Sequence, residues 1–472
     1  MTTNVKSEYT ATIGLEIHAE LKTATKMFCS CKNDPDEKRP NVNVCEVCTA
    51  QPGTLPVLNK QAIEHVIRVG LAAGSDIADF TEWDRKNYFY PDIPKNYQIS
   101  QYKYPIVSGG SIRGVKLTRI HLEEDTGAST HDQGDFSLVN YNRAGVPLME
   151  LVTEPVIHSG EDAAAFAKEL QLLLQYLGAS DANMEKGEMR VEANISVSKT
   201  DKLGTKVEVK NLNSFNTVQR AVAYEIERHI AALEAGEKIV QETRGWDEAK
   251  QKTFSQRVKE DSHDYRYFPD PDLPKMMLSE VFDLTALKNG LPELPWQKRE
   301  KYVVLGIKAE DADSFVNNTE LGNFFEKTIA HLEGNTDAIK AAANYISSDL
   351  VGLRAKDATL GYPNPEHFAA LIGMSQAGEI SSRVAKDLLA RLAKEDFDPK
   401  TVAESEGLLQ KSDEGELKVM IEKLITENPT VVADYKAGKE AALMFFVGQM
   451  MKLTKGSANP QVIKKILVET LG

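Results

Sequence analysis

The chain has 472 residues, which is too long for a single hydrophobic core and predicts two to four domains. Its net charge of −14 at pH 7 excludes a surface coated with basic residues, while 42% hydrophobic residues is an ordinary globular value. The sequence runs directly into an alternating strand, and its longest apolar stretch, AALMFFVGQMM, is too short to span a bilayer. We therefore expect a cytoplasmic protein without a membrane partner.

Short strands with a few helices are predicted up to residue 295. The strands alternate apolar and polar residues, as in ATIGLEIHAEL, KLTRIHLEED, PLMELVTE, MRVEANISVS and TKVEVKNL. Three stretches of helical periodicity interrupt them: KQAIEHVIRVGLAAG, EDAAAFAKELQLLLQYLG and NTVQRAVAYEIERHIAAL. This mixture predicts an α+β body, residues 1–295, with a largely antiparallel sheet that ends at the proline-rich segment GLPELPWQ.

Beyond this boundary the periodicity is helical. We predict a helical domain over residues 296–410 and a small helical tail domain over 411–472, in which NPT and KGSANP separate the last helices. Residues 441–472 contain four lysines and one acidic residue, an excess of three positive charges. Either a solvated helix face or a contact with RNA explains this modest excess.

All four cysteines lie within one segment, CSCKNDPDEKRPNVNVCEVC: Cys29, Cys31, Cys45 and Cys48. A C-x-C pair and a C-x-x-C pair separated by thirteen residues fit a tetrahedral zinc site of four thiolates. Two disulfides are the alternative that a reducing cytosol disfavours, and the spacing is unlike those of familiar iron–sulfur sites. Four thiolates leave no position open for water, so the pattern favours a structural zinc at 29–48 and excludes a zinc hydrolase.

Several predicted strands carry one apolar face and one face of acids and bases. In the first strand Glu16, His18 and Glu20 point away from the apolar residues between them. Arg190 and Glu192 alternate with apolar residues in the same way in RVEANIS. A half-exposed antiparallel sheet with solvated ion pairs is the simplest explanation of such strands.

Two acidic residues do not fit that explanation. The alternation places Glu124 on the side of Ile120 and Leu122, and Glu150 on the side of Leu148 and Val152. A carboxylate on an apolar side must be protonated, paired or bound to a cation. The nearby ligand types favour a hard divalent ion, Mg²⁺ or Mn²⁺, and the alternative is an ion pair with Arg119, Arg143 or Lys210.

A magnesium centre beside basic side chains on an open sheet suits phosphoryl transfer. The sequence contains no G-x-x-x-x-G-K-[ST] loop, so no motif assigns the residues that contact ATP. Two stretches rich in tyrosine and proline, 84–101 and 263–274, either stack an adenine or an unpaired RNA end, or form loops that pack on the core.

Eight long motifs occur in order along the chain: IGLEIHAEL, DRKNYFYPDIPKNYQISQ, RIHLEEDTG, NRAGVPLMELVTEP, MRVEANIS, KNLNSFNTVQRA, ETRGWDE and DYRYFPDPDLP. These motifs and the tail sequence VGQMMKLTKGSANPQ resemble the B subunits of the aspartyl/glutamyl-tRNA(Asn/Gln) amidotransferases. The resemblance implies a body of glutamine-synthetase-like type, a helical domain and a tail that contacts tRNA.

The resemblance also implies a reaction. ATP and Mg²⁺ serve to phosphorylate the side-chain carboxylate of glutamate or aspartate misacylated on tRNA(Gln) or tRNA(Asn), and ammonia then displaces phosphate. The ammonia comes from a glutaminase A subunit, and a small C subunit completes a heterotrimer. No DNA partner is expected. The sequence does not select between the two tRNAs. A ligase for a free amino acid and a non-catalytic tRNA-binding scaffold are the competing interpretations.

Individual positions follow from the same resemblance. The family's metal-binding positions fall on His18, Glu124 and Glu150, and its acidic catalytic neighbours on Glu16, Glu123 and Glu192. Relatives can carry Asp at the position of Glu192, so we expect a water-mediated contact there. Arg143 is expected to offset charge on the γ-phosphoryl group. The cysteines resemble a zinc knuckle that only some members carry, so its loss is expected to affect stability more than chemistry.

Overall fold

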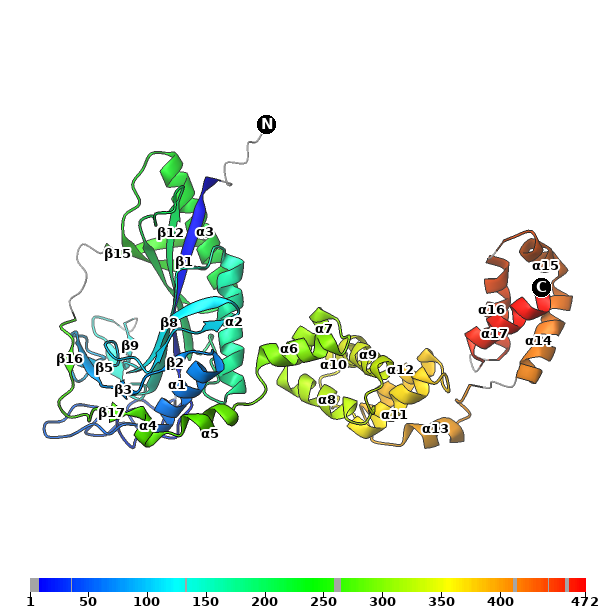
Figure 1. Ribbon diagram of the computed structural model, residues 1–472, viewed down its shortest axis with the longest axis horizontal. Helices are drawn as coiled ribbons and strands as arrows, with labels where there is room; N and C mark the ends of the chain where they lie inside the picture. Colours follow the sequence, from blue (N-terminus) through cyan, green and yellow to red (C-terminus); the bar gives the residue numbers. More distant parts are fainter. Residues whose placement is uncertain are drawn as a thin grey trace. The chain divides into compact units, whose positions relative to one another are not determined.

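The computed structural model describes residues 8–34, 36–131, 134–258, 265–410, 414–439, 441–454 and 458–472. The chain forms two compact units, Met1–Pro295 and Trp296–Gly472 (Figure 1). All described strands lie in the first unit, and the second unit is helical. The predicted α+β class is confirmed, whereas the glutamine-synthetase-like type and a further division at residue 411 stay predictions.

One large sheet organises the first unit. Its strands follow the order β15-β14-β13-β12-β1-β11-β8-β5-β4-β16, and only the β13–β14 pair among them is parallel. Their bounds are β1 (Thr10–Glu20), β4 (Asp84–Asn87), β5 (Tyr97–Ser100), β8 (Val115–Glu124), β11 (Pro147–Thr153), β12 (Met189–Ser198), β13 (Val207–Leu212), β14 (Glu242–Asp247), β15 (Lys252–Val258) and β16 (Phe268–Pro269). The largely antiparallel sheet predicted from the alternation is therefore present.

Short strands complete the sheets. Three join the large sheet off its main path: β2 (Asp76–Ile77), β6 (Val107–Ser108) and β7 (Ser111–Ile112). Two pairs stand apart: β9 (Ala128–Thr130) with β10 (Leu138–Asn140), and β3 (Phe80–Thr81) with β17 (Met276–Met277).

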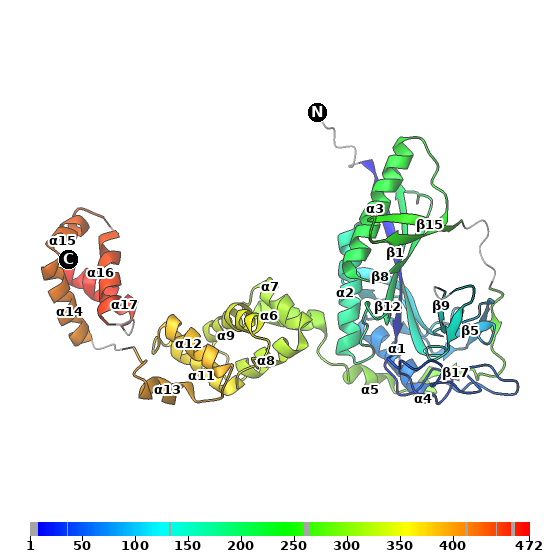
Figure 2. The ribbon, with the colours of Figure 1, turned by 180° about the vertical axis from the view of Figure 1, so that it is seen from behind.

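Helices cover the apolar side of the long strands. The bounds are α1 (Lys60–Ala72), α2 (Gly160–Tyr176), α3 (Phe215–Glu234), α4 (Leu278–Val281) and α5 (Leu284–Asn289). The side-chain oxygens of Asn59, Ser159 and Ser214 cap the first three helices, because each accepts a backbone N–H of the first turn. Figures 1 and 2 show α2 and α3 beside β1 and β12, with β5, β9 and β16 toward the other side. These two long helices therefore lie away from the short strands that border the polar side of β1.

The second unit contains short helices. Their bounds are α6 (Pro295–Val304), α7 (Ala309–Asn317), α8 (Thr319–Ile329), α9 (Thr336–Asn344), the π-helix η2 (Tyr345–Leu350), α10 (Val351–Lys356), α11 (Pro365–Gln376), α12 (Ser382–Leu392), α13 (Pro399–Ser405), α14 (Glu414–Glu427), α15 (Pro429–Lys436), α16 (Ala441–Leu453) and α17 (Pro460–Leu471). The last four share a core around Ile421, Phe446 and Ile463. Lys455, one of the tail lysines, lies outside the described residues. Within the described part of the chain, no helix has the length and apolar composition that a bilayer span requires.

A buried ion cluster joins α3 to the edge of the large sheet. The Glu225 carboxylate is fully buried and accepts hydrogen bonds from Arg228 at 2.9 Å and from the hydroxyl of Thr253. Arg244 of β14 lies 3.3 Å from the same carboxylate. Burial alone would raise the pKa of Glu225, but the close contact with His229 and the hydrogen bonds from Arg228 and Thr253 lower the pKa to about 2.

We expect the substitution Glu225→Gln to lower the free energy of unfolding by about 3 kcal/mol at pH 7. The folded-state pKa of Glu225 lies below its unfolded value of 4.5, so its contribution is complete above about pH 4.5 and disappears as the pH falls toward 2. Urea unfolding of both proteins at pH 7, 5 and 3 measures this difference. A difference that stays constant over this range would contradict the assignment.

Candidate active site

A row of four side chains crosses the polar face of the large sheet. The backbone register places His18 of β1 opposite Arg190 of β12 and opposite Glu150 of β11, and it places Glu150 opposite His121 of β8. Directly opposed residues of an antiparallel ladder point to the same face. Glu150 therefore lies between two imidazoles, with its Oε2 atom 3.5 Å from Nε2 of both His18 and His121.

Two further carboxylates flank this row. Oε1 of Glu16 lies 4.0 Å from Nε2 of His18, and Oε1 of Glu123 lies 3.6 Å from Nε2 of His121. Glu16 is opposite Glu192 of β12. The polar alternation predicted for the first strand thus becomes one continuous acidic and imidazole surface across four strands.

Basic side chains partly neutralise these acids. Arg119 lies 3.4 Å from Glu150, and Lys86 lies 3.5 Å from Glu123. Glu123 also accepts a hydrogen bond from the amide of Gln98 at 2.9 Å. Lys210 donates to Glu192 at 2.6 Å, on the neighbouring strand β13. Of the ion pairs predicted for Glu124 and Glu150, the one between Arg119 and Glu150 is present, whereas Lys210 pairs with Glu192 and Arg143 pairs with Asp125.

The close charges shift several pKa values. Burial alone would lower the pKa of His18, but the hydrogen bond and charge of Glu150 raise the pKa to about 9. Burial would raise the pKa of Glu123, and Lys86 and His121 instead lower the pKa to about 2. Burial and the charges of Glu150 and Glu192 raise the pKa of Glu16. On the two sides of this row, the environment therefore raises the pKa of one flanking acid, Glu16, and lowers that of the other, Glu123.

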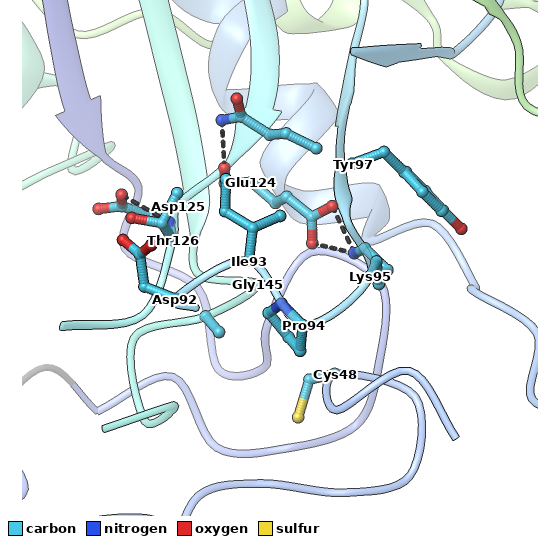
Figure 3. A pocket seen from close by; sticks show the side chains of 12 residues that line it. Cys48, Asp92, Ile93, Pro94, Lys95, Tyr97, Glu124, Asp125, Thr126 and Gly145 are labelled. Atoms are coloured by element: carbon cyan, nitrogen blue, oxygen red, sulfur yellow. Dashed lines mark hydrogen bonds and ion pairs between the residues drawn. The ribbon is translucent and has the colours of Figure 1, made fainter. Parts of the chain in front are cut away.

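Glu124 does not join this group. It is the neighbour of Glu123 in β8 and therefore points to the opposite face of the sheet. Its carboxylate accepts the backbone N–H of Ile99 at 2.9 Å and pairs with Lys95, beside Cys48 (Figure 3). The alternation correctly separated Glu124 from the polar residues of its strand, but the cation that accompanies it here is a lysine. For Glu150 the expected apolar side was wrong, because the side that it shares with Leu148 and Val152 lies on the polar face, opposite His18 and His121. Of the three expected metal positions, the structure brings together His18 and Glu150.

Asp125, just after β8, forms the centre of a second charged group. It lies 3.0 Å from Arg190 and 3.5 Å from Arg143. Arg143 also donates to the backbone carbonyls of Thr126 and Gly127, at 3.0 and 3.1 Å. Although burial opposes this, the two arginines lower the pKa of Asp125. We call Glu16, His18, His121, Glu123 and Glu150 together the carboxylate centre. Because Arg190 lies in the same row as His18, the Asp125 group borders this centre.

Glu20, on the same face of β1, is the remaining acid of this region. Burial and the charge of Asp125 raise the pKa of Glu20 to about 8, against the lowering effect of Arg190 and Arg143. The environment thus drives the pKa values of these two neighbouring carboxylates apart, upward for Glu20 and downward for Asp125. No sequence pattern paired Glu20 with Asp125.

Four tyrosines, Tyr88, Tyr102, Tyr265 and Tyr267, form what we call the tyrosine wall. The rings of Tyr102 and Tyr267 stack with centroids 5.0 Å apart, and Tyr265 meets both Tyr88 and Tyr267 edge to face. The Arg119 guanidinium lies 4.9 Å from the Tyr102 ring. The two predicted aromatic stretches therefore meet beside the carboxylate centre, while residues 263 and 264 lie outside the described part of the chain.

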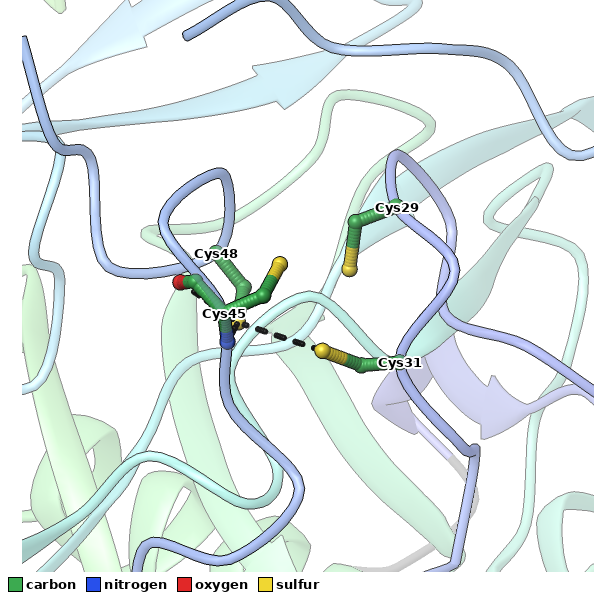
Figure 4. A group of neighbouring side chains, drawn as sticks. All are labelled: Cys29, Cys31, Cys45 and Cys48. Carbon is green, nitrogen blue, oxygen red and sulfur yellow. Dashed lines mark hydrogen bonds between the residues drawn. The ribbon is translucent and has the colours of Figure 1, made fainter.

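The four cysteines converge from two loops, and their sulfur atoms point toward a common centre (Figure 4). Their sulfurs lie within 4.8 Å of one another, and the Cys45 N–H donates to Sγ of Cys48 at 3.1 Å. A hydrogen bond from Cys29 and the charge of Lys26 lower the pKa of Cys48 to about 5, against the effect of burial. A stabilised thiolate among four close sulfurs, none of which forms a disulfide here, fits a soft metal ion such as Zn²⁺.

The carboxylate centre fits a hard divalent cation. Among the described residues, two groups of potential ligands share Glu150: one with Glu16 and His18, the other with His121 and Glu123. Nδ1 of the buried His121 lacks a hydrogen-bond partner within that part of the chain. Three carboxylates with two imidazoles suit Mn²⁺ as well as Mg²⁺. His121 and Lys86 were not predicted as site residues from the sequence. The alternation in this strand does indicate that His121 shares a side with Arg119 and Glu123, so His121 could have been found.

Comparison with known proteins agrees with this arrangement. The GatB/GatE catalytic domain family matches residues 11–282, and the GatB domain family matches residues 323–471. The chain belongs to the GatB family. The matched catalytic domain contains every residue of the carboxylate centre, the tyrosine wall and the cysteine group.

Relatives of this GatB-family chain match it along its length. It is 44% identical to a protein of Persephonella marina, over 98% of this chain and all of the relative. It is 43% identical to a protein of Crocosphaera subtropica, over 99% of each chain, and 44% identical to one of Thermus thermophilus, over 98% of this chain and 99% of the relative. All three relatives are named as the B subunit of an aspartyl/glutamyl-tRNA(Asn/Gln) amidotransferase.

Proposed function

We propose that this chain is the catalytic B subunit of a tRNA-dependent amidotransferase. It converts glutamate or aspartate misacylated on tRNA(Gln) or tRNA(Asn) into the corresponding amide, with ATP as co-substrate. Similarity over the full length to relatives named for this activity supports the reaction. The observation that carries the proposal is the position of Glu150 between His18 and His121, inside the segment that matches the catalytic domain family.

The reaction has two steps. An oxygen of the substrate carboxylate attacks the γ-phosphorus of ATP, the bond to the β,γ-bridging oxygen breaks, and ADP leaves. Ammonia then attacks the carbonyl carbon of the acyl phosphate, phosphate departs with the bonding electrons, and the nitrogen loses a proton. The first step is needed because oxide is a poor leaving group, and its catalysis consists mainly of positioning and charge neutralisation.

Residues of the polar face supply these functions. His121, Glu123 and Glu150 would hold a divalent cation, with His18 on the other side of Glu150, and the cation would neutralise charge on the transferring phosphoryl group when bound. Glu16 and Glu192 face the same space and are suited to accept the proton of incoming ammonium. Glu124 has no direct part in this proposal, because Lys95 occupies its carboxylate.

Arg143 is suited to offset phosphoryl charge. Its hydrogen bonds to two backbone carbonyls fix the guanidinium, and its side chain remains 34% exposed. The tyrosine wall offers a stacking surface for an adenine ring, which both ATP and the 3′ end of a tRNA carry.

Family membership supports our proposals for the partner subunits, the tail domain, the type of fold and the cysteine group. The relatives' designation as B subunits supports an assembly with a glutaminase A subunit and a small C subunit. We assign tRNA contact to the tail domain, residues 411–472, a glutamine-synthetase-like type to the body, and a structural Zn²⁺ to the cysteine group. Four converging sulfurs support the last assignment.

Reconstitution tests the function directly. The chain is combined with candidate A and C subunits, ATP, Mg²⁺ and each misacylated tRNA, and the aminoacyl group is analysed after deacylation. We expect the amide to form together with one ADP per amide. Free glutamate or aspartate should not replace the charged tRNA.

Two results would overturn the proposal. Amidation of a free amino acid without tRNA would favour a ligase, and full amidation after the substitution Glu150→Ala would favour a non-catalytic scaffold. The two tRNA arms also establish whether one or both charged tRNAs are substrates.

A further inference from the structure

The segment that contains the four cysteines, residues 29–48 and called here the cysteine segment, holds the loop that carries Arg143. This loop, residues 140–146 and called here the Arg143 loop, begins at the last residue of β10 and leads into β11. The Asn142 side-chain oxygen accepts the backbone N–H groups of Val42 and Asn43 at 2.9 and 3.0 Å, and its nitrogen donates to the carbonyl of Arg39 at 2.7 Å. Asn142 is only 6% exposed, so water does not readily replace these bonds.

Further bonds join the same two segments. Asn41 accepts the backbone N–H of Tyr141 at 2.7 Å, and the backbone N–H of Asn41 donates to the side chain of Asn140 at 3.1 Å. At the other end of the loop, the backbone N–H of Met27 donates to the carbonyl of Gly145 at 2.7 Å. The cysteine segment and the residues just before it thus clamp the Arg143 loop at both ends.

Lys26 connects the sulfur atoms themselves to the loop. It is fully buried, donates to the carbonyl of Tyr141 at 3.1 Å and lies 3.9 Å from Sγ of Cys48. Four thiolates around one Zn²⁺ carry a net negative charge, which favours a buried ammonium at this place. Removing the metal would therefore loosen the two cysteine loops and, with them, the contact between Lys26 and Sγ of Cys48.

The clamped loop reaches the charged group of the active site. The Gly145 N–H donates to the carbonyl of Asp125 at 2.9 Å, and Arg143 lies 3.5 Å from the Asp125 carboxylate. Asp125 in turn binds Arg190, which is in the same row as His18. A displacement of the loop by about 1 Å would change the position of Arg143, and displacements of this size cost about 100-fold in rate.

We propose that the cysteine segment positions the Arg143 loop for phosphoryl transfer, with Asn142 as the positioning residue. This inference rests on the proposed function. It differs from the expectation that loss of zinc affects stability more than chemistry, because the bonds lead from the cysteines to a reacting group. Asn142 acts through Arg143 and contacts no substrate.

The test uses the reconstituted complex with wild-type chain, Asn142→Ala and Asn142→Asp. We expect Asn142→Ala to lower kcat for amide formation by about 10- to 100-fold, with KM for ATP and the zinc content unchanged. Asn142→Asp keeps the acceptor for Val42 and Asn43 but loses the donor to Arg39, so we expect a partial recovery of kcat. Hydrogen exchange should accelerate at the backbone amides of the Arg143 loop in Asn142→Ala.

A matched control is Asn335→Ala. Asn335 also accepts two backbone N–H groups, at the start of α9 in the second unit, and this variant should keep the wild-type kcat. Removing zinc from the wild-type complex with a chelator should lower kcat by about as much as the substitution Asn142→Ala does. Removing zinc from the Asn142→Ala complex should lower its kcat little further, because metal removal and the substitution act on the same loop.

The outcomes separate the two proposals. If wild-type complex forms no amide, the proposed function fails. If wild type is active and Asn142→Ala has the wild-type kcat, or if its loss matches only a smaller folded fraction by circular dichroism, the positioning role is wrong.

Discussion

The substitution Glu150→Gln is expected to lower the rate of amide formation in the reconstituted complex by at least about 1000-fold. Glu150 is the one residue shared by both groups of potential ligands, and it contacts both imidazoles of the row. The amide of glutamine keeps the shape but removes the negative charge that a cation requires. Glutamine hydrolysis by the partner should continue, so ammonia and amide production become uncoupled.

The matched control for this experiment is Glu154→Gln. Glu154 follows the same strand and accepts a hydrogen bond from the Thr118 hydroxyl at 2.7 Å, at a partly exposed position. We expect less than about a 3-fold change in rate from a surface substitution of this kind. A Glu150→Gln complex with more than a tenth of wild-type activity would exclude a cation-binding role for this residue.

The second large effect separates Glu123 from its neighbour Glu124. The structure places Glu123 at the carboxylate centre and Glu124 on the opposite face, against Lys95. We expect Glu123→Gln to weaken Mn²⁺ binding by at least about 100-fold, because a direct ligand is lost. Glu124→Gln should keep Mn²⁺ affinity within about 3-fold and lower the free energy of unfolding by about 3 kcal/mol, since it leaves Lys95, whose side chain is only 13% exposed, without its partner.

Calorimetric titration with Mn²⁺ and urea unfolding of both variants provide the two measurements. The pair of substitutions is its own control, because the residues are adjacent and chemically identical. If Glu124→Gln weakens Mn²⁺ binding as strongly as Glu123→Gln does, the assignment of the two faces is wrong.

The sequence alone determined several features through local rules. The period-two alternation of β1 established which side of the strand carries Glu16, His18 and Glu20, because strand geometry makes this independent of neighbours. Cysteine spacing predicted the convergence seen in Figure 4, and helical periodicity predicted α1, α2 and α3. The motifs that resemble the GatB family led to a membership that the comparisons confirm.

Only the tertiary structure decided which acids meet. Alternation correctly separated Glu124 from the polar residues of its own strand. It could not show whether Glu124 and Glu150 lie on the same face of the sheet, because that depends on the pairing register of β8 with β11. The same register brought His121 into the row. The bonds between Asn142 and residues 39–43 likewise join positions about a hundred apart in the chain, and no local pattern encodes a contact made only by the folding of two distant loops.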